Sequence, residues 1–450
     1  MPVKVVHIVS LGCPKNLVDS EVIAASLTRT GYRLTDRPEE AEVIVVNTCG
    51  FIEPAKEESI EEILRMAAWK AGGKGPCTHL VVTGCLAQRY GKELAAALPE
   101  VDLFLGINET PRLSAHLASL CVTGPVRQHS RTRIGRPTYL MTASDRSGRS
   151  LLSASAYLKI ADGCSNCCAY CAIPMIRGKA RSRPMDDILR EAGELADRGV
   201  REVIITAQDT TAYGADLKGK PTLALLLEEL ARINGIAWIR LLYTYPAHLS
   251  EALFRTMAAS DKICHYLDVP IQHCDPAVLV AMRRQGDKAL IRCVIAQARS
   301  LVPDIALRTS LIVGFPGETW RRFEHLLDFT QEIRFDHLGV FTYSREEGTP
   351  AASLPSRISE QEKERRRGLV LEQQQRISLA INQSLIGSRQ EILVEGQGEL
   401  EGWDGVGRCR RQAPEVDGVT YLRGVRTAPG QLLTGRIIAA DDYDLYAEPL

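Results

Sequence analysis

Three cysteines lie close together in the middle of the chain, Cys164, Cys168 and Cys171, with the spacing C-x3-C-x2-C. Thiolates are the usual ligands of iron–sulfur clusters, and a 4Fe–4S cube takes four of them. A loop that offers three therefore leaves one iron open to an exchangeable ligand, which indicates chemistry rather than plain electron transfer. The alternative is three unrelated buried cysteines, but such residues seldom gather on one short loop. Cys167 is interpreted as a bystander.

A second set of three cysteines lies in the first part of the chain, at Cys13, Cys49 and Cys85. Each follows the end of a different predicted strand, and each has a glycine beside it. Loops at the carboxyl ends of parallel strands open into one crevice, so we expect the three thiols to converge. A zinc site with three cysteine ligands is one interpretation. A second iron–sulfur cluster is favoured, because the chain already carries a loop suited to one.

Length, charge and cysteine content exclude several classes of protein. The 450 residues are enough for two to four domains. The 55 basic residues equal the 55 acidic ones, so no global charge indicates nucleic acid or an anionic membrane. We recognise no signal peptide and no apolar stretch of the ~20 residues that a membrane span requires. The thirteen cysteines then favour metal binding or catalysis over disulfides, and we expect a cytoplasmic protein.

The first part of the chain, residues 3–120, alternates short β-branched runs with helical patterns. This alternation predicts a doubly wound, parallel α/β domain. Residues 121–153 are rich in arginine, glycine, serine and threonine, and we interpret them as a linker, either a basic contact strip or a solvated loop. The predicted strands are 5–9, 43–46 and 80–83, and the predicted helices are 17–30, 54–68 and 88–97.

A second alternation occupies residues 154–382 and repeats six times. Six βα units are too few to close a TIM barrel of eight, so the pattern predicts an open (β/α)6 partial barrel whose site lies at the carboxyl ends of its strands. The first cysteine triad follows the first of these strands directly. The predicted strands are 157–160, 202–206, 238–243, 266–269, 306–313 and 337–343.

The last part of the chain differs in pattern and in charge. A long charged helix is predicted from Ser359 to about residue 385, with Glu362 completing a capping box. Glycine-separated strands at 391–394, 418–423 and 432–439 then predict a small OB-like β-barrel over residues 383–450. This barrel carries seven arginines against eleven acidic residues, whereas nucleic-acid modules are usually basic.

Together, the two triads, the domain order and the terminal barrel resemble the methylthiotransferases of the radical S-adenosylmethionine (SAM) superfamily over the whole chain. Four runs resemble the branch that modifies a ribosomal protein rather than the branch that modifies tRNA. The terminal barrel corresponds to the TRAM domain of this family, which binds RNA in the tRNA enzymes. The excess of acidic over basic residues in this barrel suits binding to a basic ribosomal protein better than binding to RNA. The four runs are SLGCPKNLVDS (10–20), NTCGFI (47–52), AQDTTAYG (207–214) and YSREEGT (343–349).

The resemblance implies two 4Fe–4S clusters and two uses of SAM. A cluster at Cys164, Cys168 and Cys171 would chelate SAM and cleave it, and the resulting radical would take the β-hydrogen of an aspartate in small-subunit ribosomal protein twelve. A second cluster, the one assigned to the N-terminal triad, would deliver sulfur, and a further SAM would provide the methyl group. The cofactor rather than a side chain would carry the difficult step, so we assign no catalytic side chain.

The resemblance also implies residues that contact SAM. Tyr170 is aromatic, as is usual just before the last cysteine, and Gly314 lies on a glycine-containing strand of the kind that contacts adenine. The usual Gly-Gly-Glu after the second strand is replaced by residues 207–209, where Gln208 and Asp209 are candidates. Arg308 is a further candidate, as are Gln272 and His273 for SAM or substrate, and each of these could equally be a structural polar group.

Four basic residues follow the first triad and could offset the charge of its cluster, or form a solvated strip. They are Arg177, Lys179, Arg181 and Arg183.

The implied partners are small-subunit ribosomal protein twelve and an electron donor such as flavodoxin, with no membrane and no stable DNA binding. Two other functions stay open. The same chemistry could modify an adenosine of tRNA, or the chain could be a non-catalytic iron–sulfur carrier or RNA-binding module, for which a SAM-binding barrel would have no use.

Overall fold

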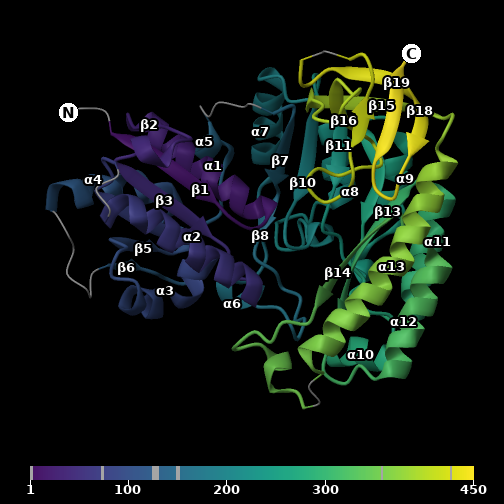
Figure 1. Cartoon of the computed structure of the whole chain (residues 1–450), viewed down its shortest axis with the longest axis horizontal. Coiled ribbons are helices and arrows are strands. Elements are labelled where there is room, and N and C mark those ends of the chain that lie inside the picture. Colours follow the sequence, from purple (N-terminus) through teal and green to yellow (C-terminus); the bar gives the residue numbers. More distant parts are fainter. Residues whose placement is uncertain (1–3, 72–74, 124–130, 148–152, 356–357, 426–427) are drawn as a thin grey trace.

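The first unit is a parallel sheet with a hydrophobic core on each face, as the sequence predicts (Figure 1). The computed structural model describes residues 4–71, 75–123, 131–147, 153–355, 358–425 and 428–450. The strands are paired in the order β2-β1-β3-β4-β5-β6. They are β1 (Val5–Ser10), β2 (Arg33–Leu34), β3 (Val43–Thr48), β4 (His79–Gly84), β5 (Leu103–Leu105) and β6 (Thr132–Arg133).

The central strand β3 explains why this sheet needs two helical layers. It reads VIVVNT and is buried along its whole length, which is the pattern of a parallel strand covered on both faces. One face carries α1 and α4, and the other carries α2 and α3. These helices are α1 (Pro14–Arg29), α2 (Glu53–Ala71), α3 (Cys85–Ala97) and α4 (Leu113–Thr123).

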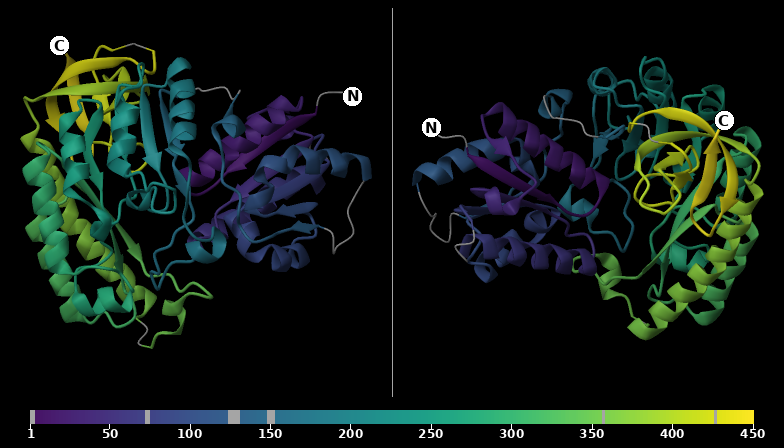
Figure 2. Two further views of the ribbon diagram at one scale, coloured as in Figure 1. Left: turned by 180° about the vertical axis from the view of Figure 1, so that it is seen from behind. Right: turned by 45° about the horizontal axis from the view of Figure 1, so that its top comes forward.

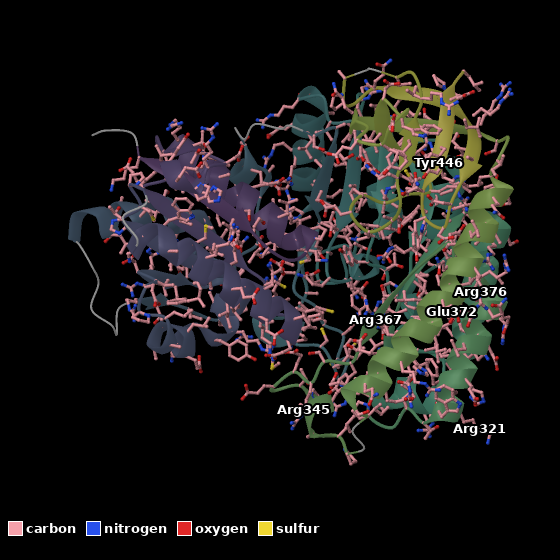
Figure 3. All side chains as sticks on the ribbon, in the orientation of Figure 1. Arg321, Arg345, Arg367, Glu372, Arg376 and Tyr446 are labelled. Carbon is pink, nitrogen blue, oxygen red and sulfur yellow. The ribbon has the colours of Figure 1, made fainter. Side chains whose placement is uncertain are left out.

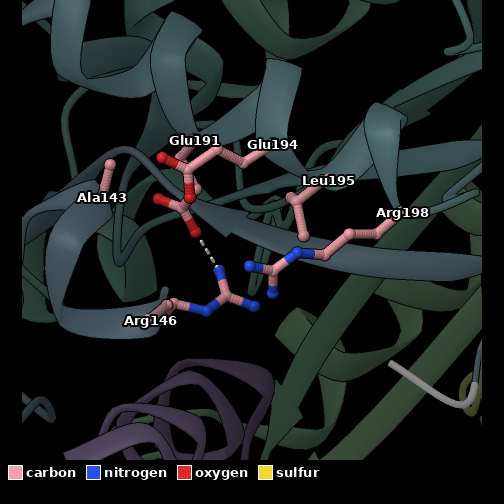
Figure 4. A pocket seen from close by; sticks show the side chains of 6 residues that line it. All are labelled: Ala143, Arg146, Glu191, Glu194, Leu195 and Arg198. Atoms are coloured by element: carbon pink, nitrogen blue, oxygen red, sulfur yellow. Dashed lines mark hydrogen bonds and ion pairs between the residues drawn. The ribbon is translucent and has the colours of Figure 1, made fainter. Parts of the chain in front are cut away.

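Part of the segment predicted as a linker is built into the folded units. Strand β6 pairs with β5, and a short helix, α5 (Ala143–Arg146), contacts α1. Arg131 is buried and donates to backbone carbonyls of the first unit. Arg146 is buried between Glu21 and Glu191, beside a shallow pocket (Figure 4). Since these two arginines are buried, the solvated-loop interpretation is wrong for them; Arg127 and Arg149 lie outside the described residues.

The second unit is the predicted open (β/α)6 partial barrel. Its six parallel strands are ordered β14-β13-β12-β11-β10-β7, so the sheet ends at β14 and β7. The strands are β7 (Ser155–Lys159), β10 (Glu202–Thr206), β11 (Trp238–Leu241), β12 (Ile263–Asp268), β13 (Ala306–Val313) and β14 (His337–Thr342). The helices are α7 (Met185–Asp197), α8 (Leu223–Ala231), α9 (Glu251–Ala259), α10 (Pro276–Ala281), α11 (Lys288–Leu301) and α12 (Trp320–Ile333).

The other two units close the inner face of this barrel. Trp238, Tyr266 and other inward-facing residues of the barrel strands share one hydrophobic core with Val18 of α1 and Leu393 of the third unit. In Figure 2 the first unit lies beside the β7 side of the barrel, and the third unit lies over one end of it. The barrel lacks two of the eight βα units of a closed TIM barrel. Its open sheet is nevertheless covered, because the neighbouring units provide the apolar contacts.

The third unit is a closed β-barrel ordered β15-β16-β17-β19-β18, which confirms the predicted small barrel. Two of its strands, β16 and β19, were not predicted. The long helix α13 (Glu360–Ser384) leads into it and begins where the sequence predicts, since Ser359 accepts a hydrogen bond from the backbone N–H of Glu362. The strands are β15 (Arg389–Gln397), β16 (Gly405–Cys409), β17 (Thr420–Leu422), β18 (Leu432–Ala440) and β19 (Leu445–Pro449).

Helix α13 is charged on its outer side and anchored on its inner side. Arg367, Glu372 and Arg376 are exposed along it (Figure 3). Lys363 instead donates to the backbone carbonyl of Tyr343 at the barrel mouth, and it is buried. The helix therefore fixes the loop that follows β14.

Candidate functional site

The first cysteine triad lies on a loop at the carboxyl end of the first barrel strand. A ribbon of β8 (Ala161–Asp162) and β9 (Arg181–Ser182) closes the base of this loop, and α6 (Ile173–Ile176) follows it. Gly163 has a φ of 78°, and a Cβ there would lie 2.3 Å from the carbonyl oxygen of Lys179, so only glycine fits. The backbone N–H of Cys171 donates to the carbonyl of Cys168 at 3.1 Å, which makes the turn tight.

Burial and mutual proximity oppose ionisation of these thiols. Burial raises the pKa of Cys171 to about 12, with Cys168 and Cys164 as further causes. Burial, Asp209 and Cys168 raise the pKa of Cys164 to about 11. The three sulfurs therefore lie close enough to sense one another's charge. A bound metal deprotonates a coordinating thiol outright, so this set of donors fits a metal cluster better than three free thiolates.

The second triad lies at the carboxyl edge of the first sheet. Cys13, Cys49 and Cys85 follow β1, β3 and β4, which are adjacent strands. Glycines let the three loops approach: a Cβ on Gly12 would lie 2.6 Å from the Cβ of Cys49, and a Cβ on Gly50 would lie 3.0 Å from the carbonyl carbon of Cys85. The three loops therefore pack closely, and they bring the three cysteines near one another, as the strand order predicts.

Two of these cysteines lie at helix N-termini. Cys13 is the N-cap of α1 and Cys85 is the first residue of α3, where the helix dipole favours a thiolate. Burial opposes ionisation of Cys13, yet Lys15 and Arg177 hold its pKa below the usual value. Burial raises the pKa of Cys85 and raises that of Cys49 to about 12, with Cys85 as a further cause.

The second triad packs against the segment that follows the first triad. Cys85 packs in one small hydrophobic cluster with Ala172 and Ile176, and Ala172 directly follows Cys171 of the first triad. The carboxyl ends of the two sheets therefore face each other, with one cysteine triad on each side.

Arg177 connects the two sheets at this point. It is fully buried at the end of α6, and its Nη2 donates to Asp19 of α1 at 2.7 Å and to the sulfur of Cys85 at 3.4 Å. Its Nη1 donates to Asp162 at 3.1 Å. Asp162 is buried too, and Arg177 with Lys159 holds its pKa below the usual value. The sequence left two roles open for Arg177, offsetting the charge of a cluster or lying in a solvated strip. Its contacts favour the first role, but beside the second triad rather than the first.

The other basic residues after the first triad have different surroundings. Arg183 is buried and pairs with Asp187 and Glu191, so it is not part of a solvated strip. Arg181 donates to the backbone carbonyl of Pro137 at 2.9 Å.

Gln208 and Asp209 lie after β10, at the barrel mouth. The Nε2 of Gln208 donates to Asp162 at 3.0 Å, while its Oε1 is buried and has no hydrogen-bond partner among the described residues. Asp209 accepts hydrogen bonds from Asn166 at 2.7 Å and from the backbone of Thr211 at 3.0 Å, and it contacts His248. Gln208 thus has an acceptor free for a ligand, whereas Asp209 already has structural partners.

Tyr170 is held by an arginine that the sequence analysis did not single out. The Nη1 of Arg284 lies 3.1 Å from the hydroxyl of Tyr170 and 3.9 Å from the sulfur of Cys168. Arg284 also stacks over the ring of Tyr245 and is half-buried. It lies far from the triad in sequence, so no local pattern could have indicated it.

Arg308 lies in an ion-pair cluster at the interface between the barrel and the third unit. Its guanidinium is 3.3 Å from Asp268 and 3.4 Å from Asp417, and Asp417 also accepts a hydrogen bond from Tyr266 at 2.6 Å. These partners favour the structural role that the sequence left open for Arg308.

Gly314 lies in a turn that Glu318 stabilises. The carboxylate of Glu318 accepts hydrogen bonds from the backbone of Gly314 and Phe315, and Gly314 has a φ of 75° beside the stem of Lys363. His273 is buried with its Nε2 3.9 Å from Glu318. Gln272 joins β13 through backbone hydrogen bonds.

Within the described part of the chain, no group of three or more His, Cys, Asp or Glu side chains is arranged to hold a metal ion as it stands. None of the helices described there combines the length and apolar character that crossing a bilayer requires.

Three family profiles match consecutive parts of the chain. They are "Uncharacterized protein family UPF0004" at residues 5–106, "Radical SAM superfamily" at residues 158–330 and "TRAM domain" at residues 386–450.

Curated relatives match almost the whole chain. The ribosomal protein uS12 methylthiotransferase RimO of Syntrophus aciditrophicus is 59% identical over 445 residues, which cover 98% of each chain. The protein of the same name from Geobacter sulfurreducens is 47% identical, again with 98% of each chain covered. A distant solved structure, the radical SAM methyltransferase TsrM from Kitasatospora setae with a SAM analogue, is 13% identical with a TM-score of 0.58, covers 87% of this chain and 78% of its own, and is similar in fold.

Proposed function

Because the chain belongs to the RimO family of radical SAM methylthiotransferases, we propose that it attaches a methylthio group to the β-carbon of an aspartate in ribosomal protein uS12. The chain is an enzyme of methylthio transfer, and its family uses 4Fe–4S clusters and SAM. The proposal adds two clusters, one at each cysteine triad, and two molecules of SAM per turnover. The observation that carries it is that Cys85 of the second triad packs in one cluster with Ala172, which directly follows Cys171 of the first.

Each triad provides three thiolate ligands, so each cluster keeps one iron for another ligand. The metal ligands are Cys164, Cys168 and Cys171 for the first cluster and Cys13, Cys49 and Cys85 for the second. When bound, the first cluster and SAM supply the radical that removes a hydrogen, and the second cluster supplies the sulfur. Two facing triads would let a substrate carbon lie within reach of both sources without moving between sites.

The chain's own residues position SAM and limit the access of water. Gln208 is the best supported of the predicted contacts, because its buried Oε1 lacks a partner and could accept a hydrogen bond from the ammonium group of SAM. Tyr170 and Gly314 would contact SAM directly. Asp209 and Arg308 would shape the mouth through their own ion pairs. Helix α1 covers the open side of the barrel and shields this region.

The proposed partners are uS12 and a one-electron donor such as flavodoxin. The acidic third unit supports a basic ribosomal protein over tRNA. The alternatives remain an adenosine of tRNA as substrate, and a zinc ion rather than a cluster at the second triad.

The test is product analysis with both substrates. The full chain is reconstituted anaerobically with iron and sulfide, then incubated with SAM, a reductant and either recombinant uS12 or unmodified tRNA. Mass spectrometry is expected to find a methylthio group on an aspartate of uS12 and none on tRNA. Product on tRNA alone would replace the proposal with the first alternative, and failure to cleave SAM would reject both.

A further inference from the structure

Lys15 is a buried cation without a carboxylate partner. It is the second residue of α1 and is 7% exposed. Its ammonium lies over the ring of Tyr243, 3.2 Å from the ring centroid. Among the side chains that the structure describes, no carboxylate lies within ion-pair distance of it. A buried charge is costly unless it is paired, so an anion placed beside this ammonium would be stabilised.

The other cations near the triads already have polar partners. Arg177 and Lys159 pair with Asp19 and Asp162. Arg284 donates to the backbone carbonyl of Pro270 at 2.7 Å and contacts Tyr170. Like Lys15, Arg284 has no carboxylate within ion-pair distance among the described residues, but Lys15 is the more buried of the two.

Lys15 lies between the second triad and the barrel mouth. It is two residues from Cys13, which is the N-cap of α1. Its other neighbour, Tyr243, follows β11, and the backbone carbonyl of Tyr243 accepts from Thr210, next to Asp209. Lys15 therefore extends from the first unit to the loops that carry the predicted SAM contacts.

Tyr243 is held in a conformation that non-glycine residues seldom adopt. Its φ is 60°, in the left-handed region, and its backbone N–H donates to the carboxylate of Asp268 at 2.8 Å. Such a conformation persists only where the surroundings impose it, and it is common at ligand sites. The ring that faces Lys15 is thus fixed by the barrel.

We propose that Lys15 binds the side-chain carboxylate of the substrate aspartate, with the ring of Tyr243 as the wall beside it. This inference rests on the proposed function. The β-carbon of aspartate is bonded directly to the carboxylate carbon, so a cation that fixes the carboxylate also fixes the carbon that reacts. Asparagine at the same position would leave the ammonium of Lys15 unpaired, and a site with an unpaired buried group discriminates strongly.

The alternative role for Lys15 is to support the second cluster, because its positive charge would stabilise the thiolate of Cys13. The two roles differ in what they do to substrate preference. A cluster-supporting lysine would change iron content or cluster spectra and leave the preference for aspartate alone. A carboxylate-binding lysine would change that preference and leave the cluster intact.

The experiment measures binding and cluster content on the reconstituted full chain. The probes are fluorescently labelled uS12 and a uS12 variant with the target aspartate replaced by asparagine, and affinity is read by anisotropy. The enzyme variants are Lys15→Met, Lys15→Gln and Lys15→Arg. Lys70→Met is the matched control, because Lys70 pairs with Asp102 on the first unit, away from both triads.

We expect the unmodified enzyme and Lys70→Met to bind the aspartate form about ten- to a hundredfold more tightly than the asparagine form, the range for a charge-assisted contact. Lys15→Met and Lys15→Gln should bind both forms equally, with iron content unchanged. Lys15→Arg should retain part of the preference.

Three results would overturn the inference. They are no preference for aspartate in the unmodified enzyme, an undiminished preference in Lys15→Gln, and loss of the second cluster in both neutral variants. The first needs no variant, so a misfolded protein cannot obscure it. Failure of the proposed function has a different signature, namely an unmodified enzyme that forms no methylthio product on uS12.

Discussion

At the scale of single residues, Arg177 has the largest electrostatic role at the contact between the triads. It is buried between Asp19 and Asp162 and donates to the sulfur of Cys85. A positive charge beside a cluster ligand favours the reduced cluster, because net charge and hydrogen bonds to sulfur set its potential. Arg284 occupies the corresponding place at the first triad, near Cys168.

These two arginines make a matched pair of variants. Arg177→Met should lower the reduction potential of the second cluster alone, and Arg284→Met that of the first cluster alone. Arg177→Met should also reduce stability by about 3–5 kcal/mol, because it leaves two buried carboxylates, Asp19 and Asp162, with Lys159 as their single cation. Redox titration followed by electron paramagnetic resonance, with calorimetry, measures both effects. A shift of the same cluster in both variants would contradict this assignment.

The sequence predicts some residues of the site better than others, and sequence separation explains the difference. Cys164, Cys168 and Cys171 were found because their spacing is local. The sequence did not indicate Asp417 as a partner of Arg308, because Asp417 lies in another unit, more than a hundred positions further along the chain. Arg284 was missed for the same reason.

At the scale of elements, glycine determines how closely the loops of the second triad pack. Gly12 precedes α1 and Gly31 follows it, and both have positive φ, at 85° and 89°. A Cβ on Gly12 would collide with Cys49, whereas a Cβ on Gly31 would have nothing within 4 Å. Substitutions at Gly31 and Gly12 therefore distinguish the effect of backbone strain alone from the effect of strain together with steric crowding.

Gly31→Ala should cost about 1–2 kcal/mol through backbone strain alone and keep both clusters. Gly12→Ala carries the same strain and in addition displaces Cys49, so it should lose the iron of the second cluster while the first is retained. Iron analysis after reconstitution, with thermal unfolding, tests this. Equal iron content in the two variants would show that crowding at Gly12 does not matter.

The elements themselves were predicted where their pattern is strong. The strands β10 and β13 have the predicted bounds, since each is a continuous apolar or alternating run. Short strands were missed because pairing rather than sequence defines them. Strand β6 has two residues and exists only through its pairing with β5, and β16 contains two glycines.

At the scale of the whole molecule, buried ion pairs join the barrel to the third unit. Glu202 on β10 is wholly buried and pairs with Arg240 of the barrel and Arg408 of β16. Burial opposes its ionisation, yet Arg408 and Arg240 lower the pKa of Glu202 to about 2. The sequence could not predict this contact, because both arginines are ordinary strand residues in their own units.

The lowered pKa of Glu202 predicts an acid-sensitive interface. An unfolded glutamate titrates near 4.3, so the stabilisation by Glu202 is complete above that pH and is lost as the pH falls toward about 2. Glu202→Gln should cost about 3–5 kcal/mol at neutral pH, since it leaves Arg240 without a carboxylate partner and Arg408 with Glu395 alone. The difference in stability between Glu202→Gln and the unmodified protein, measured by thermal unfolding, should become smaller as the pH falls from about 4.5 to 2. A difference that is independent of pH would contradict the ion-pair explanation.

The central claim is that each of two facing cysteine triads holds a 4Fe–4S cluster, and metal analysis of two triple variants tests it most directly. One variant replaces Cys13, Cys49 and Cys85 with alanine, and the other replaces Cys164, Cys168 and Cys171. After anaerobic reconstitution we predict about eight irons in the unmodified chain and about four in each variant, with matching sulfide and the Mössbauer spectrum of a cubane cluster. Zinc in place of iron at Cys13, Cys49 and Cys85, or only about four irons in the unmodified chain, would contradict the account.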